Sequence, residues 1–189
     1  MDTSITQETI KGIRKEFFAY RNGIIADKMR RAGDPHPVIM GCLLVDIMTI
    51  TRQVRETMGD DDQLVAVACG LWNDANSREC RLAAPMLYPA GKMELGLAAQ
   101  WCQSVETTEI ADNLCHKLLR HLDCANDLLR QLIVQEKPLV KYTGYRLLLN
   151  LLIMGKTAPS ASLRAVAEAD AHQPGLSHII QDILEEIDR

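Results

Sequence analysis

The chain has 189 residues, enough for one domain with a substantial core, and 47% of them are hydrophobic although only 4% are aromatic. The net charge of −4 lies entirely in residues 158–189, because the first 157 residues carry 19 basic and 19 acidic side chains, which excludes the strongly basic body typical of nucleic-acid binders. We expect a cytoplasmic protein with free thiols, since its six cysteines form no CxxC pair and no signal peptide or long apolar run predicts secretion or membrane insertion.

In chain order, the first half of the sequence predicts helices separated by glycine- and proline-containing turns. The breakers are Gly33-Asp-Pro-His-Pro37, Gly59 and Pro89-Ala-Gly91, which interrupt helical hydrogen bonding or favour turns. The acids Asp60-Asp-Asp62 suit the beginning of a helix, where the helix dipole favours negative charge. The expected helices cover residues 5–31, 38–58, 64–72, 78–87 and 94–102.

The second half continues the helical pattern. Apolar residues recur at Ile110, Leu114, Leu118 and Leu122, which is the spacing of one helix face. Pro138 suits the first turn of the strongly apolar segment that follows it. The expected helices cover residues 108–121, 125–135, 139–154, 160–169 and 176–187.

These elements predict an all-α protein that forms a single domain over residues 1–189. Leu and Ala are good helix formers, and little Val-Thr-Tyr alternation is available for a sheet. About nine helices with short turns favour an α-solenoid, a right-handed stack of antiparallel helix pairs that bury faces no single pair can bury. A non-repetitive helical bundle is the alternative.

Asp112 and Arg146 are the most informative charged residues, because each lies in an amphipathic helix. A charge that faces an apolar core needs a partner or a ligand, since an unpaired buried charge is costly. The two residues can pair with each other or bind a charged ligand together. Arg78 and Arg81 are further candidates for contact with phosphate. We expect no metal and no cofactor, because the cysteines and histidines lack the spacing of a zinc site.

Short motifs in the middle of the chain carry a family resemblance. They are Leu71-Trp72, Glu79-Cys-Arg81-Leu-Ala-Ala, Trp101, Ala111-Asp112 and Arg146. In this order and spacing they resemble the DNA alkylation repair family of HEAT-like repeat proteins, the AlkD-like DNA glycosylases. The resemblance covers about residues 15–157, and the acidic residues 158–189 diverge from the family.

The resemblance implies a C-shaped stack of HEAT-like repeats that holds duplex DNA in a concave groove. Such proteins remove N3- and N7-alkylated purines by hydrolysing the N-glycosidic bond. By resemblance, Asp112 matches the catalytic aspartate and Arg146 matches the DNA-contacting arginine.

The sequence departs from the family at two places. Thr108 stands where the family has a tryptophan before the aspartate, and residues 160–189 contain no tryptophan and few basic residues. An aromatic face attracts a cationic base, so these losses remove that attraction. The alternative function is therefore a HEAT-like scaffold that has no catalytic activity and holds a protein partner in the same groove.

Overall fold

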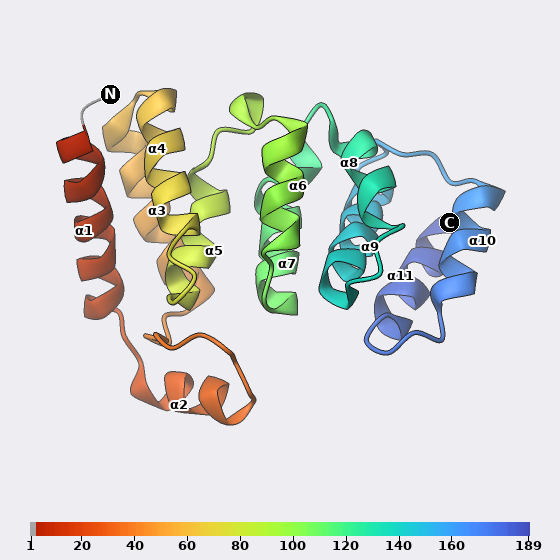
Figure 1. The fold of residues 1–189 in the computed structure, drawn as a ribbon, viewed down its shortest axis with the longest axis horizontal. Helices are drawn as coiled ribbons and strands as arrows, with labels where there is room; N and C mark the ends of the chain where they lie inside the picture. Colours follow the sequence, from red (N-terminus) through yellow and green to blue (C-terminus); the bar gives the residue numbers. More distant parts are fainter. Residues whose placement is uncertain (1–2) are drawn as a thin grey trace. The chain divides into compact units, whose positions relative to one another are not determined.

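The structure is a computed structural model that describes residues 3–189 (Figure 1). The chain divides into two compact units, of which the first ends at Lys92 and the second begins at Met93. Each unit has its own set of packed helices. The single domain and the right-handed solenoid expected from the sequence stay predictions.

The first unit is built around the buried helix α5. Ser77 caps this helix, because its hydroxyl accepts a hydrogen bond from the backbone N–H of Cys80. Helix α5 packs against α3 and α4, and α1 packs against α4 (Figure 1). The elements of this unit are α1 (Thr3–Ala19), α2 (Gly23–Arg31), α3 (Leu44–Met58), α4 (Asp61–Trp72), α5 (Arg78–Leu87) and the 3-10 turn η1 (Ala90–Lys92).

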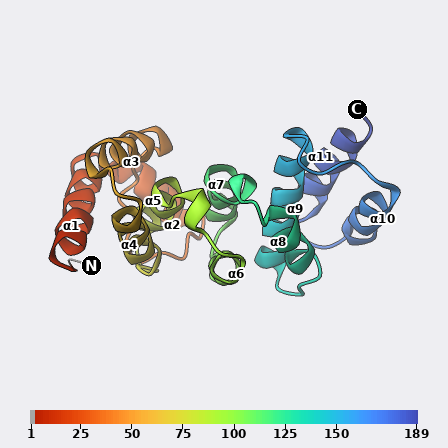
Figure 2. The same ribbon diagram turned by 90° about the horizontal axis from the view of Figure 1, so that it is seen from above.

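The second unit is built around helix α9 (Pro138–Ile153), which packs against α7, α8 and α11 (Figure 2). Its acidic C-terminal segment forms α10 and α11, and Ile179, Ile180 and Ile183 of α11 are buried. The tail thus covers an apolar face of the unit. The remaining elements are α6 (Leu95–Gln103), α7 (Thr108–Lys117), the 3-10 turn η2 (Leu119–His121), α8 (Ala125–Leu132), α10 (Ala161–Asp170) and α11 (Ser177–Ile187).

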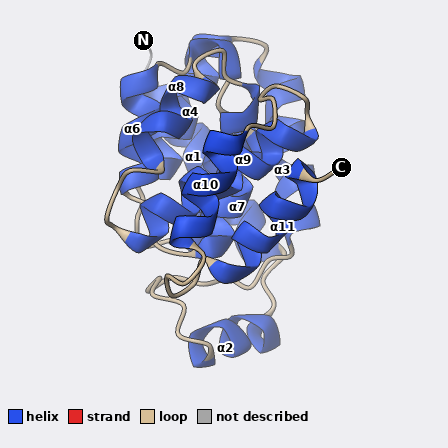
Figure 3. Ribbon diagram, turned by 90° about the vertical axis from the view of Figure 1, so that its right-hand side faces the viewer, coloured by secondary structure: helices blue, strands red, loops and turns tan. Residues whose placement is uncertain are grey.

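Helices are the only extended regular elements in residues 3–189, which confirms the all-α class (Figure 3). A single isolated bridge joins Val38 to Ser77. Among the described residues, no helix combines the length and the hydrophobicity needed to cross a membrane. All six cysteines are free thiols.

Several expected helices differ from the structure at their boundaries: α4 begins earlier, at Asp61, and α7 and α8 end earlier, at Lys117 and Leu132. The two largest differences lie in the first unit. The helix expected over residues 5–31 is interrupted after Ala19, and Asn22 caps the separate helix α2 by accepting hydrogen bonds from Ile24 and Ile25. Helix α2 lies apart from the other helices of its unit (Figures 1 and 3). The helix expected over residues 38–58 begins only at Leu44, because the backbone before it is held by contacts with α5 described below.

Candidate functional site

Helices α7 and α9 bring together Asp112, Tyr142 and Arg146, here called the Asp112 cluster. Helix α7 begins after Thr107, whose hydroxyl accepts a hydrogen bond from the backbone N–H of Ile110. The two helices pack closely in the second unit, and their buried apolar residues fix which side chains meet. The cluster therefore depends on the packing of one helix pair.

Tyr142 and Arg146 both contact the same carboxylate oxygen of Asp112. The Tyr142 hydroxyl donates a hydrogen bond of 2.8 Å to Oδ1, and Arg146 Nε lies 3.3 Å from the same atom. The contact with Arg146 is an ion pair without hydrogen-bond geometry. Tyr142 and Arg146 lie one turn apart on α9, a spacing that places both side chains on the same helix face.

Some polar atoms of the Asp112 cluster remain available to bind a ligand. Among the described residues, neither Oδ2 of Asp112 nor the two terminal nitrogens of Arg146 makes a hydrogen bond. The side chains of Arg146 and Asp112 are 28% and 41% exposed. A carboxylate oxygen and a guanidinium edge are therefore open to a ligand, in contrast to a pair that is fully satisfied within the protein core.

Tyr142 was not among the residues singled out from the sequence. Burial raises the pKa of its hydroxyl, and the hydrogen bond to Asp112 raises it further. The hydroxyl therefore stays protonated and keeps donating to Asp112. Its position one turn before Arg146 was a usable signal, because a residue at that spacing shares the face that meets α7.

A group of basic side chains lies near the Asp112 cluster at the end of α7. Lys156 Nζ donates to the Arg120 carbonyl at 2.9 Å, and Arg120 Nε lies 3.2 Å from His121 Nε2. Burial lowers the pKa of His116, and the positive charges of nearby residues, including Arg120 and Arg146, lower it further. These interactions indicate a locally positive environment at this end of the helix pair.

A second cluster occupies a different face of α9. Lys141 Nζ lies 3.1 Å from Asp170 Oδ2, and the Tyr145 hydroxyl donates to the same oxygen at 2.7 Å. The side chains of Lys141 and Asp170 are only 14% and 16% exposed. This cluster ties the last residue of α10 to α9, so we assign it a structural role.

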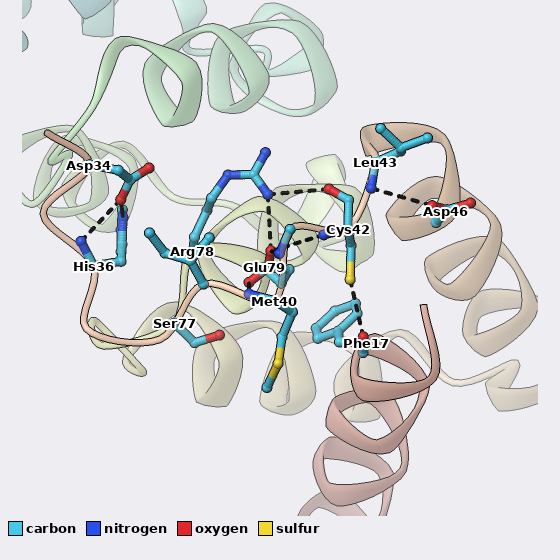
Figure 4. Close-up of polar contacts among 12 residues, drawn as sticks. Phe17, Asp34, His36, Met40, Cys42, Leu43, Asp46, Ser77, Arg78 and Glu79 are labelled. Atoms are coloured by element: carbon cyan, nitrogen blue, oxygen red, sulfur yellow. Dashed lines mark hydrogen bonds and ion pairs between the residues drawn. The ribbon is translucent and has the colours of Figure 1, made fainter. Parts of the chain in front are cut away.

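Arg78 belongs to a buried network in the first unit (Figure 4). Its Nη1 donates to Glu79 at 3.0 Å and to the Cys42 carbonyl at 3.3 Å. The Glu79 carboxylate accepts the backbone N–H groups of Met40, Gly41 and Cys42 at distances of 3.1, 3.0 and 3.3 Å. The network therefore fixes the segment before α3 onto the beginning of α5.

Arg81, the other arginine of the first unit that was expected to contact phosphate, is also buried, and so are both tryptophans. Arg81 is 5% exposed, and its guanidinium lies 4.5 Å from the centre of the Trp72 ring. Trp72 and Trp101 are each 3% exposed, so neither presents a ring face to a base. The structure brings Asp112 and Arg146 together but places Arg78 and Arg81 inside the first unit. DNA contact by these two arginines stays a prediction.

The described residues contain no group of three or more histidine, cysteine or acidic side chains arranged to hold a metal ion. Cys115, which lies beneath the Asp112 cluster, donates its thiol to the Thr143 carbonyl at 3.4 Å. Burial raises the pKa of this thiol well above its ordinary value. It therefore stays in the unreactive thiol form and contributes to the packing of α7 on α9.

Comparison with known proteins identifies the family. A family model described as DNA alkylation repair enzyme matches residues 13–175. No curated protein and no solved structure gave a match. Because the family match spans much more than half of the chain and includes the whole Asp112 cluster, the chain belongs to the DNA alkylation repair enzyme family.

Proposed function

We propose that this protein binds duplex DNA and hydrolyses the N-glycosidic bond of N3- or N7-alkylated purines. Asp112 is the proposed catalytic residue, and Arg146 is the proposed ligand of a backbone phosphate. The observation that carries the proposal is the partly exposed Asp112–Arg146 pair, which keeps a carboxylate oxygen and two guanidinium nitrogens available in a member of this family.

The chemistry suits a carboxylate without a strong acid beside it. An N-alkylated purine is already cationic, so it leaves with the electron pair of the bond to C1′ and needs no added proton. Positive charge then develops on the sugar, where a nearby carboxylate stabilises it. Water adds to C1′, and Asp112 Oδ2 accepts its proton as a general base. The hydrogen bond from Tyr142 to Oδ1 holds the carboxylate in position during these steps.

Binding of the DNA backbone is assigned to the positive charges in the second unit. The free terminal nitrogens of Arg146 match the geometry of two phosphate oxygens. Arg120 and Lys156 add positive charge at the end of α7, where they contact each other through the Arg120 carbonyl. Each phosphate contact releases counterions, so affinity should fall as salt rises.

Base recognition in this proposal depends on charge more than on stacking. Thr108 is exposed at the first position of α7, where the resembled family carries a tryptophan. Tyr142 is the aromatic residue that contacts Asp112. A carboxylate attracts a cationic purine without an aromatic face, although without the added attraction that such a face supplies. We therefore expect selectivity for purines that carry a positive charge.

The decisive measurement is release of 3-methyladenine and 7-methylguanine from methylated duplex DNA, with an active family enzyme as positive control. Asp112→Asn should lower the rate of release by at least about 100-fold, because it removes the general base. Asp123→Asn is the matched control, since it makes the same change at an exposed acid of the second unit. Equal activity of Asp112→Asn and the wild type would reject the catalytic assignment.

Binding is tested separately by fluorescence anisotropy with unmodified duplex DNA over a range of salt concentrations. Arg146→Gln should lower the slope of log affinity against log salt by roughly one, as expected for one lost phosphate contact. An unchanged slope would contradict the role of Arg146. No binding by the wild type at low salt would overturn the proposal and favour the alternative of a protein scaffold.

A further inference from the structure

An open pocket of ≈ 470 Å³ lies beside helix α2 in the first unit, whereas the residues of the proposed function belong to the second unit. The end of α1, one face of α2 and the segment before α3 line it. Two of its lining residues, Arg21 and Arg30, are cationic. We propose that this α2 pocket binds a phosphate group, carried either by a nucleic-acid backbone or by a free phosphate ester.

Both arginines are held in place while keeping donors to spare. The Arg21 guanidinium lies 3.9 Å from the centre of the Phe18 ring and donates to the Phe18 carbonyl at 2.8 Å. Arg30 donates to the Ile39 carbonyl at 3.1 Å and to Asp27 at 2.8 Å. A guanidinium has about five N–H donors, so these contacts orient each side chain and leave other donors for a ligand.

The charge around the pocket favours an anion. Residues 21–31 contain four cations and one acid, whereas the whole chain has a net charge of −4. The single acid, Asp27, is 63% exposed, and its partner Arg30 is 50% exposed. Such an exposed pair is weak because water screens it. A phosphate that contacts two arginines can therefore displace this interaction.

The pocket also has room for a group attached to the phosphate. Gly23 and Ala26 line the α2 side, where short side chains allow a ligand to approach the helix backbone. Ile39 and Met40 add apolar lining next to the arginines. The combination accommodates a charged head and a less polar attached group, as small-molecule sites commonly do. Arginine pairs are suited to phosphate because their planar forks match its oxygens.

The test is an NMR titration of the full chain with sodium phosphate at constant ionic strength, with sodium chloride as the blank. We expect amide shifts that saturate at Gly23, Ala26 and Ile39. The variant Arg21→Gln/Arg30→Gln should abolish them, whereas Arg31→Gln, which removes an exposed cation of the same helix outside the pocket, should retain them. Circular dichroism confirms that each variant remains helical. If the double variant unfolds, the single variants Arg21→Gln and Arg30→Gln replace it in the test. Each of them should weaken phosphate binding.

Absence of localised shifts, or identical responses of the double variant and Arg31→Gln, would overturn the proposal. Parallel titrations with adenosine monophosphate and duplex DNA identify the source of the phosphate. If DNA is the ligand, the double variant lowers the salt slope of DNA binding by roughly two. If only the mononucleotide acts, the slope is unchanged while its shifts disappear. Arg146→Gln should leave all pocket shifts intact, so failure of the proposed function is distinguished from failure of this proposal.

Discussion

The two units each contain an arginine–carboxylate pair, and the pairs differ in surroundings more than in distance. Arg78 and Glu79 are separated by 3.0 Å, and Arg146 and Asp112 by 3.3 Å. The first pair is 2% and 0% exposed and the second 28% and 41%. Glu79 also binds three backbone N–H groups, whereas Asp112 keeps one oxygen free. Similar residue types thus fasten the chain in one unit and remain available to a ligand in the other.

The largest expected effect is on the buried pair. Glu79→Ala removes the acceptor of three backbone N–H groups together with a carboxylate that pairs with buried Arg78. We expect a loss of about 3–5 kcal/mol in the free energy of unfolding, measured by urea denaturation. Glu56→Ala removes an exposed partner of Arg52 and should cost less than about 1 kcal/mol. Similar losses in both variants would show that the burial of the Arg78–Glu79 pair adds nothing to its effect on stability.

Gly41→Ala tests how tightly the segment before α3, which Glu79 binds, is packed. Gly41 has φ +75°, and an added Cβ would lie 2.2 Å from the Asn22 carbonyl oxygen and 2.7 Å from the Ala26 nitrogen. We expect a loss of at least about 2 kcal/mol, because both backbone strain and overlap with backbone atoms arise. Gly12→Ala lies in open space within α1 and should instead stabilise by up to about 1 kcal/mol. Thermal and urea unfolding of both variants measure the difference.

In the Asp112 cluster, Tyr142→Phe sharpens the comparison through the dependence of stability on pH. Because burial and Asp112 raise the Tyr142 pKa, its stabilising contribution is fully present below the ordinary tyrosine pKa. That contribution should be lost as pH rises above about 10 toward the folded-state pKa. The variant should lose about 1 kcal/mol at neutral pH and show a shallower alkaline decline. Tyr20→Phe, at an exposed position, should reproduce the wild-type curve of unfolding free energy against pH.

The smallest expected effect is the coupling between Asp112 and Arg146. A double-mutant cycle with Asp112→Asn and Arg146→Gln should give a coupling free energy below about 1 kcal/mol, because the pair is only half-buried and its contact lacks hydrogen-bond geometry. Urea unfolding provides the four free energies. A coupling free energy as large as the stability loss of Glu79→Ala would indicate that the Asp112–Arg146 pair stabilises the fold. It would then count against a functional role of the pair.

Local signals predicted much of the fold, and contacts between distant residues account for the errors. The helix predicted over residues 78–87 is confirmed at both ends, since Ser77 caps it and the turn at Pro89 follows it. The helix predicted from residue 38 is wrong before Leu44, because Glu79 binds backbone groups there across a long sequence separation. No local pattern indicates that contact. Asn22 was a local capping signal that the prediction of one helix over residues 5–31 overlooked.

The candidate site was predictable in part for the same reason. The apolar patterns around Asp112 and Arg146 indicated two helices, and the structure brings these two side chains together. Tyr142 required knowledge of which face of α9 meets α7. The burial of Arg78 and Arg81 depended on how α5 packs between its neighbours, because their sequence positions resemble those of solvated helix residues.

The paired spacing on α9 also restricts where the length of this chain can change. Lys141 and Tyr145 meet Asp170, while Tyr142 and Arg146 meet Asp112. One inserted residue turns everything beyond it by about 100° around a helix axis. An insertion just before Lys141 would therefore move both sets of side chains away from their carboxylates at once. Insertions and deletions that preserve the fold should therefore fall in the turns outside Pro138–Ile153. The number of residues in this helix fixes the positions of both clusters.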